Sequence, residues 1–492
     1  MNRNSLKDTL GDRLNTPFAA KMHFRNLFKL VKALSYFLLT NSFTWLSKKK
    51  IPRILRLLFL QHRLIQSAFG SFCLKIANSL LSLVLSVMLA RILGVTKFGI
   101  FSLYLSIVGL LTVPSLLGAE NILVREISIY RASGNFYCIK ELLINSRRAS
   151  LFFSFFLIFI VATIAAFLYP DRSKLVPFLM ALIIVPLQTC IRLNSAVLRG
   201  LGHVLQGQLA LTFRPFILIV LVCLTYILYN RNMDLQIVLF LFIFSVIIMV
   251  TCTYMQIRRK LDLGPRSART EFDKSRWIKS ILPFVFLSIM QILNAEFSVL
   301  LLGTLQGATA VGIYRVAQHG SEIIPFCLIA VNMAIAPTVS ELFFRDDKKR
   351  LQELIDKSVL FMLSFALPVM FFLIISGKWF ISSLFGFEYI SAYYPMIILI
   401  LGQLVNVGMG SVGLLLNMAG LERITAIGVT ISSIICLILN TVLIPFWGPL
   451  GAALATSGSL IIMNISLSVW LHRETGILST FCYRKINKSN TP

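Results

Sequence analysis

The stretch "LARILGVTKFGIFSLYLSIVGLL", residues 89–111, places Gly94 and Gly99 between two long apolar runs. Glycine suits a tight turn that needs a positive φ angle, and it lets helix ends approach closely. We therefore expect a short turn here that joins two helices.

The same pattern returns about two hundred residues later. "LQGATAVGIYRVAQH" begins at Leu305 and aligns Gly307, Gly312 and Tyr314 with the two glycines and Phe101 of the first stretch. A second pair, "LRGLG" at 198–202 and "MAGLE" at 418–422, supports the match, and the two offsets are 213 and 220. The sequence thus predicts an internal repeat.

The composition indicates a helical membrane protein. Of the 492 residues, 57% are hydrophobic and only 14% are charged, and the mean hydropathy is +0.82. A helix needs roughly 20 apolar residues to span a bilayer, and continuous apolarity without alternation favours helices over a barrel. We predict an all-α polytopic fold with about twelve spans, near 66–90, 98–124, 149–169, 175–198, 207–228, 236–257, 279–302, 309–337, 358–376, 391–417, 424–445 and 449–471.

The net charge of +27 follows the membrane topology. With the N-terminus inside, 37 of the 47 Lys and Arg fall in cytoplasmic segments, 6 fall outside and 4 fall within spans. This positive-inside bias predicts that both termini are cytoplasmic, in a cell (inner) membrane. The basic excess then faces anionic membrane lipids, and no nucleic-acid partner is needed.

The repeat divides the chain into predicted parts: a basic extension 1–65, a six-helix lobe 66–257, a basic linker 258–278, a second six-helix lobe 279–471 and a basic tail 472–492. An even number of spans per lobe makes the repeat parallel. This design favours an alternating-access transporter with its cavity between the lobes over a duplicated scaffold without transport. In the extension, "FRNLFKLVKALSYFLL" predicts a basic amphipathic helix, either an interfacial anchor or a docking surface for a partner enzyme.

"LARILGVTKFGIFSL", "LLGAENILVREISIYRASG" and "AVLRGLGH" resemble the Wzx-like polysaccharide and O-antigen flippases, in the MOP superfamily that also holds MATE exporters and MurJ-type lipid II flippases. The resemblance covers about residues 66–475. It implies two six-helix lobes around a V-shaped cavity, and movement of undecaprenyl-pyrophosphate-linked oligosaccharide from the inner to the outer leaflet. The two extra helices typical of the MurJ-like branch are not found.

Ionisable residues inside a membrane are costly and indicate functional sites. In the first lobe, Lys75 shares a face of span 1 with Asn78 and several serines, while Arg192 and Arg214 lie about six residues from the inner ends of their spans. Such cations could capture a pyrophosphate that enters from the cytoplasm. Both arginines could instead extend to the inner headgroups.

In the second lobe, Glu296 and Arg315 lie at similar depth on adjacent spans and are expected to form an ion pair. Arg315 also belongs to a polar stripe, and Gln291 and Asn294 lie on a comparable stripe of span 7, although Glu296 is off that face. The stripe on span 8 comprises Arg315, Gln318, His319 and Glu322. These side chains could bind sugar hydroxyls or a coupling cation.

Coupling to H⁺ or Na⁺ needs an acid that titrates, and either Glu322 or Glu120 could serve. Glu120 could equally pair with Arg125 at the interface. The sequence leaves the coupling ion open.

Three functions compete. A lipid-linked oligosaccharide flippase agrees with the excess of interior cations; a MATE-like cation-coupled drug or metabolite antiporter would favour interior acids. A membrane polysaccharide polymerase or glycosyltransferase would need a larger outer loop than the one around 377–394. No catalytic motif, cofactor or metal site is apparent, and the eight cysteines are scattered. Expected partners are the lipid-linked oligosaccharide, membrane lipids and, as an open possibility, the polysaccharide polymerase and chain-length machinery.

Overall fold

The computed structural model describes residues 53–168, 172–228, 233–262 and 274–479. The chain divides into two compact units, residues 1–64 and 65–492. In the first unit, the described residues 53–64 are helical; the following account concerns the second unit. The amphipathic helix expected from Phe24, the centre of the 258–278 linker and the end of the tail lie outside the described residues.

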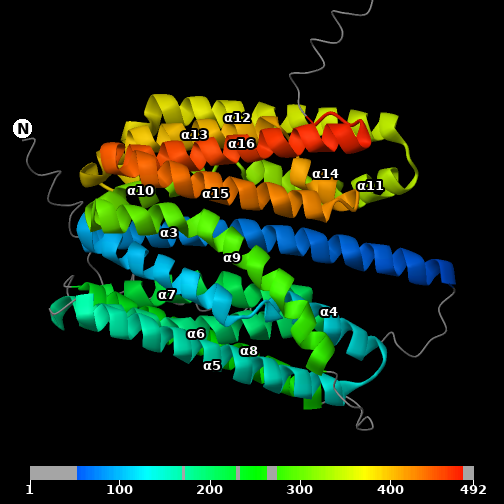
Figure 1. The fold of residues 1–492 in the computed structure, drawn as a ribbon, viewed down its shortest axis with the longest axis horizontal. Helices are drawn as coiled ribbons and strands as arrows, with labels where there is room; N and C mark the ends of the chain where they lie inside the picture. Colours follow the sequence, from blue (N-terminus) through cyan, green and yellow to red (C-terminus); the bar gives the residue numbers. More distant parts are fainter. Residues whose placement is uncertain (1–52, 169–171, 229–232, 263–273, 480–492) are drawn as a thin grey trace, which may run out of the picture. The chain divides into compact units, whose positions relative to one another are not determined.

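The described part of the chain contains helices and no strand. We call α3–α8 the N-terminal half and α9–α16 the C-terminal half. The N-terminal half comprises α3 (Arg53–Ser115), α4 (Ala119–Ala132), α5 (Phe136–Leu168), α6 (Arg172–Gly200), α7 (Val204–Leu228) and α8 (Leu235–Asp262). In it, α6 packs against α4, α5, α7 and α8 (Figure 1).

The C-terminal half comprises α9 (Lys274–Leu305), α10 (Ala308–Ser321), α11 (Phe326–Phe344), α12 (Lys348–Leu384), the 3₁₀ turn η2 (Phe387–Ala392), α13 (Tyr393–Gly408), α14 (Val412–Met418), α15 (Glu422–Trp447) and α16 (Pro449–Thr475). Here α16 packs against α13 and α15, and α12 packs against α13, as these neighbouring ribbons show in Figure 1.

The helices are long and apolar enough for the predicted number of spans. Eleven candidate spans occur in the described residues, and one of them, Gly70–Ser115, has 46 residues. At about 1.5 Å per residue it is twice the length that a bilayer core requires. It contains two helices that meet at Gly94, where φ is 70° and ψ is 173°. Counting these two helices separately gives twelve crossings.

Three predicted spans are interrupted. The helix expected over 98–124 ends at Ser115, and Leu117 and Gly118 take positive φ angles before α4 begins. The span expected over 309–337 breaks between α10 and α11, with Pro325 at the start of α11. The third break separates α13 from α14. Hydropathy missed these breaks because the flanking residues remain apolar.

The backbone repeats its special conformations in both halves. Gly94 and Gly307 have φ angles of 70° and 84°, as the predicted turns require. Gly202 and Gly420 have φ angles of 83° and 76°. The second motif therefore matches with an offset of 218, and the alignment of Gly200 with Gly420, at an offset of 220, is wrong by two residues.

The halves meet where the first repeat predicts close approach. A Cβ atom on Gly99 would lie 1.8 Å from the Ala308 carbonyl oxygen, and one on Gly312 would lie 2.5 Å from the Val95 carbonyl oxygen. Ala308 and Val95 are themselves 213 residues apart, so the two contacts are equivalent by the repeat. We call this contact, formed by residues 95–99 and 308–312, the glycine contact.

Further hydrogen bonds close the same end of the molecule. The hydroxyls of Thr96 and Thr309 are 3.1 Å apart. Arg91 donates from Nε to the Leu384 carbonyl at 2.6 Å, and Tyr389 Oη donates to the Ala90 carbonyl at 3.1 Å. All three link α3 to the C-terminal half, so this end, which includes Gly94 and Gly307, is closed.

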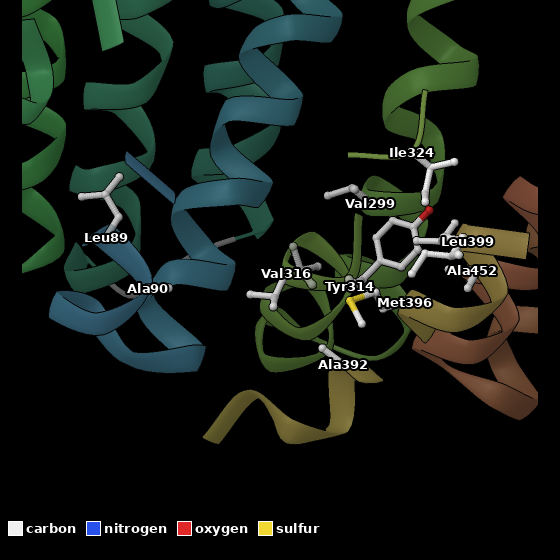
Figure 2. Packing of buried hydrophobic residues seen from close by; sticks show 14 of the residues in the cluster. Leu89, Ala90, Val299, Tyr314, Val316, Ile324, Ala392, Met396, Leu399 and Ala452 are labelled. Carbon is white, nitrogen blue, oxygen red and sulfur yellow. The ribbon is translucent and has the colours of Figure 1, made fainter. Parts of the chain in front are cut away.

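The core behind the glycine contact also follows the repeat. Phe101 packs edge-on against Phe242 of α8, with ring centroids 6.1 Å apart. Its counterpart Tyr314 lies among Val299, Met396, Leu399 and Ala452 in Figure 2, and its hydroxyl is 2.9 Å from that of Thr456. Phe242 and Thr456 occupy equivalent positions of α8 and α16, which begin 214 residues apart. An aromatic pair in one half thus replaces a hydrogen bond in the other.

Candidate functional site

The N-terminal half contains an acid between two guanidiniums. Glu120, in the first turn of α4, accepts a hydrogen bond from Arg199 Nη2 at 2.7 Å. Arg192 Nη1 lies 3.9 Å from its other carboxylate oxygen. Arg125 pairs instead with Glu126, at 2.9 Å, so the suggested pairing of Glu120 with Arg125 is wrong. The helix break after Ser115 places Glu120 in α4, which packs against α6.

The guanidinium of Arg214 is close enough to that of Arg192 for the two positive charges to interact. Its guanidinium carbon is 5.2 Å from the centre of the Phe242 ring, a cation–π contact on α8. No carboxylate pairs with Arg214 among the described side chains. Arg192 and Arg214 thus belong to one group of cations, in which Glu120 offsets part of the charge of Arg192.

Arg147 is an interior cation that lies outside the predicted spans. Its Nη2 donates to Asn194 Oδ1 at 2.8 Å, Asn194 donates to Thr253 at 3.0 Å, and the guanidinium stacks on Tyr254. Because α5 begins at Phe136, Arg147 lies well inside a helix that continues into the span. Asn194 is two residues from Arg192, on the opposite side of α6, so Arg147 lies apart from the Arg192 and Arg214 pair.

Lys75 and Asn78 lie on one face of α3 with Ser86. Lys75 is exposed and Asn78 is half-buried, and neither has a hydrogen-bond or ion-pair partner within the described residues. Ser86 Oγ lies 2.9 Å from His319 Nε2 of α10. Three helical turns beyond Lys75, this polar face therefore contacts the C-terminal half.

In the C-terminal half, the expected ion pair between Glu296 and Arg315 is present. Arg315 Nη2 also donates to Ser106 of α3, and Nη1 donates to Gln318 at 2.8 Å. Glu296 lies off the face of α9 that carries Gln291 and Asn294, as expected, and Arg315 connects it to the stripe on span 8. This network links α9, α10 and α3, and so both halves.

His319 forms a second link between the halves. Its Nδ1 lies 3.3 Å from a carboxylate oxygen of Glu322, in addition to the contact of Nε2 with Ser86. Glu322 directly follows α10 as its C-cap, and its side chain is exposed. The span 8 stripe is therefore a connected set of polar groups at a broken helix.

Gln291 and Asn294 do not join this set. Ser298, on the same face of α9, lies 3.0 Å from Thr456 of α16, so the face turns toward the interior of the C-terminal half. Glu296 lies on the other side of α9, toward Arg315. In the described part of the chain, no group of three His, Cys, Asp or Glu side chains could hold a metal ion.

Comparison with known proteins agrees with this architecture. A family model described as "Polysaccharide biosynthesis protein" matches residues 64–343. The chain is 25% identical over 382 residues to a protein of Haloferax volcanii named as the probable low-salt glycan biosynthesis flippase Agl15, with 76% of each chain covered.

Solved structures share the fold at low sequence identity. An inward-facing multidrug resistance MATE transporter of the MOP superfamily superposes with a TM-score of 0.66 at 12% identity, covering 86% of this chain and 100% of that one. The lipid II flippase MurJ, in an inward closed conformation, gives 0.61 at 14% identity, with 81% and 87% covered.

A MOP superfamily transporter from Pyrococcus furiosus, described as having a binding pocket of reverse polarity, gives a TM-score of 0.59 at 12% identity, with 84% and 95% covered. These relatives are flippases and transporters, which confirms the prediction that this chain is not an enzyme. The family model covers more than half of the sequence, and the chain therefore belongs to the polysaccharide biosynthesis protein family.

Proposed function

We propose that this membrane protein moves an undecaprenyl-pyrophosphate-linked oligosaccharide from the inner to the outer leaflet by alternating access between its two halves, which act as the predicted lobes. The named relatives support movement of a glycan carrier. The observation that carries the proposal is the placement of Lys75. This cation without a described partner lies on the polar face of α3 that contacts the C-terminal half at Ser86.

The charge distribution supports an anionic substrate. Glu120, Glu296 and Glu322 each contact at least one cationic or titratable basic side chain. Lys75 and Arg214 have no carboxylate partner within the described residues. Unpaired ammonium and guanidinium groups are good ligands for a pyrophosphate. A carrier of organic cations would need the opposite balance, so these contacts favour the flippase over the MATE-like antiporter.

The halves also divide the substrate between them. Lys75, Arg192 and Arg214 would hold the pyrophosphate, while the amide of Gln318 and its neighbours would hydrogen-bond sugar hydroxyls. For ion coupling, Glu322 is better placed than Glu120. It contacts His319, which reaches α3 at Ser86, whereas the contacts of Glu120 stay within the N-terminal half. Protonation near Glu322 can thus affect the interface between the halves.

A charge series at Lys75 tests the proposal. We expect Lys75→Ala to abolish glycan export while the protein still accumulates in the membrane, because the anion loses a ligand. Lys75→Arg should retain partial export, since the charge persists with a different geometry. Lys75→Glu should be worse than alanine because it repels the pyrophosphate. The measurement is surface glycan per unit of membrane protein, together with lipid-linked glycan retained in the inner leaflet.

Lys357→Glu provides the matched control. Lys357 is an exposed lysine on α12, in the C-terminal half. The same charge reversal there should leave export unchanged. Normal export by Lys75→Glu at normal protein level would show that the anion is bound elsewhere.

A further inference from the structure

Three basic residues surround the turn between α6 and α7. Arg131 comes from the last turn of α4, His203 directly precedes α7, and Lys260 lies near the end of α8. The guanidinium of Arg131 lies against Gly202, since a Cβ atom there would be 2.0 Å from Nη1. Lys260 Nζ donates to Gln206 Oε1 at 2.6 Å. Residues of α4, of α8 and of the turn that leads into α7 thus come together. We call Arg131, His203 and Lys260 the basic cluster.

The basic cluster lacks a counter-charge among the described side chains. Partial desolvation, the charge of Lys260 and the charge of Arg131, in that order, lower the pKa of His203 to about 4. No acid offsets this effect. The first turn of α7 also contains no acidic residue, so the positive end of the helix dipole adds to the potential. Two cations and a neutral imidazole are therefore held together at an electrostatic cost.

The fold does not require this arrangement. In the C-terminal half, the equivalent positions are occupied by Phe343 near the end of α11, Leu421 after the matching turn and Glu474 near the end of α16. Gly420 has the same backbone conformation as Gly202, so the two turns are alike. One half carries an aromatic, an aliphatic and an acidic residue where the other carries Arg, His and Lys. The cations consequently serve something other than folding.

We propose that Arg131, His203 and Lys260 form a phosphate-binding site, separate from the interior cations Lys75, Arg192 and Arg214. A phosphate group neutralises both charges and accepts hydrogen bonds from the guanidinium and the ammonium. The neutral imidazole supplies one further donor. The phosphate could belong to the headgroup of an anionic membrane lipid or to a pyrophosphate outside the bilayer, and these sources share the same chemistry.

Titration with inorganic pyrophosphate tests the site. The full-length protein in a neutral detergent is titrated at constant ionic strength, and binding is followed by the rise in unfolding temperature. Arg131→Gln and Lys260→Gln should each weaken binding at least tenfold. Lys349→Gln removes an exposed lysine at the start of α12 in the other half and should change binding less than twofold. Lys75→Glu, which disables the interior site, should retain the binding that depends on Arg131.

A lipid arm distinguishes the two sources. The protein is reconstituted in vesicles of phosphatidylcholine alone or with phosphatidylglycerol. A stabilisation by phosphatidylglycerol that Arg131→Gln abolishes assigns the site to a lipid headgroup. Pyrophosphate binding without such a lipid effect assigns it to a phosphate outside the bilayer.

The proposal is wrong if Arg131→Gln and Lys260→Gln bind pyrophosphate like the wild type, or if Lys349→Gln weakens binding equally. It is also wrong if Lys75→Glu alone removes all binding, because the anion then occupies only the interior site. The export phenotype of Lys75→Glu is measured separately, so failure of this site leaves the proposed flippase function untouched.

Discussion

Equivalent helix contacts in the two halves are made by different side chains, charged in one half and neutral in the other. Where α4 meets α6, Glu120 lies between Arg192 and Arg199. At the equivalent place in the C-terminal half, Ser411 donates a hydrogen bond to Asn332. Asn332 matches Glu120 by the helix offset of 212, and Ser411 is one residue from the match of Arg192. The fold therefore needs a polar contact here, and the charges are an addition specific to the N-terminal half.

This difference agrees with the proposed binding of pyrophosphate by one half and of sugar by the other. The N-terminal half concentrates guanidiniums in its interior, whereas the C-terminal half has Gln318, Asn332 and Asn406 near its helix breaks. Charged groups suit a pyrophosphate, and amides suit sugar hydroxyls. Three changes test the comparison, beginning with the place where the halves are most alike.

The largest effect is expected at the glycine contact. Gly99→Ala and Gly312→Ala each drive a methyl group into a backbone carbonyl of the other half. Overpacking in a core costs about 1–3 kcal/mol, and here the neighbouring atoms cannot rotate away. Both variants should lose export and unfold at lower temperature, to a similar extent because the contacts are equivalent.

Gly413→Ala provides the control for this pair, because nothing lies within 4 Å of a Cβ atom there. It should unfold and export like the wild type. A strong effect of one glycine variant and none of the other would contradict the symmetry of the contact.

A smaller effect is expected where the halves differ. Glu120→Ala removes the acid between two guanidiniums and should destabilise the protein more than Asn332→Ala, which removes a neutral hydrogen bond worth about 1 kcal/mol. The triple change Glu120→Asn, Arg192→Ser and Arg199→Asn imitates the C-terminal half. It should recover the unfolding temperature lost in Glu120→Ala but not export, because Arg192 is gone. Full export by the triple variant would show that this cluster is structural only.

The smallest effect concerns pH. The pKa of His203 is about 4 in the folded protein, below the ordinary value of about 6.5. The unfolded chain therefore binds a proton first as the pH falls, so stability present above about 6.5 is lost towards pH 4. His203→Leu imitates Leu421 and removes this dependence. The unfolding temperature of the wild type, relative to this variant, should fall between pH 7 and pH 5. An unchanged difference would contradict the lowered pKa.

Local backbone requirements made part of this molecule predictable. The turns at Gly94 and Gly307 could be predicted because few residues other than glycine adopt a positive φ. Hydropathy located the spans. The pair of Glu296 and Arg315 followed from equal depth on adjacent helices. The all-helical fold and the family resemblance were likewise predictable from the apolar runs and the quoted motifs.

What remained hidden depends on tertiary packing. The break after Ser115 includes Leu117, a residue that rarely takes a positive φ, so nothing local marked it beyond the nearby Pro114 and Gly118. This break turns Glu120 toward Arg199. One feature of the sequence could have predicted this cluster: Arg192 and Arg199 are seven residues apart and therefore share a face of α6. Arg147 was missed because α5 begins before the apolar run does.

The glycine contact has a further meaning in terms of symmetry. Each half presents the same surface to the other: residue 99 meets residue 308, and residue 312 meets residue 95. Such a contact is isologous, like the interface of a two-fold homodimer, although it is formed within one chain. A side chain at Gly99 or at Gly312 would meet the backbone of the other half, so the symmetry places the same restriction on both positions.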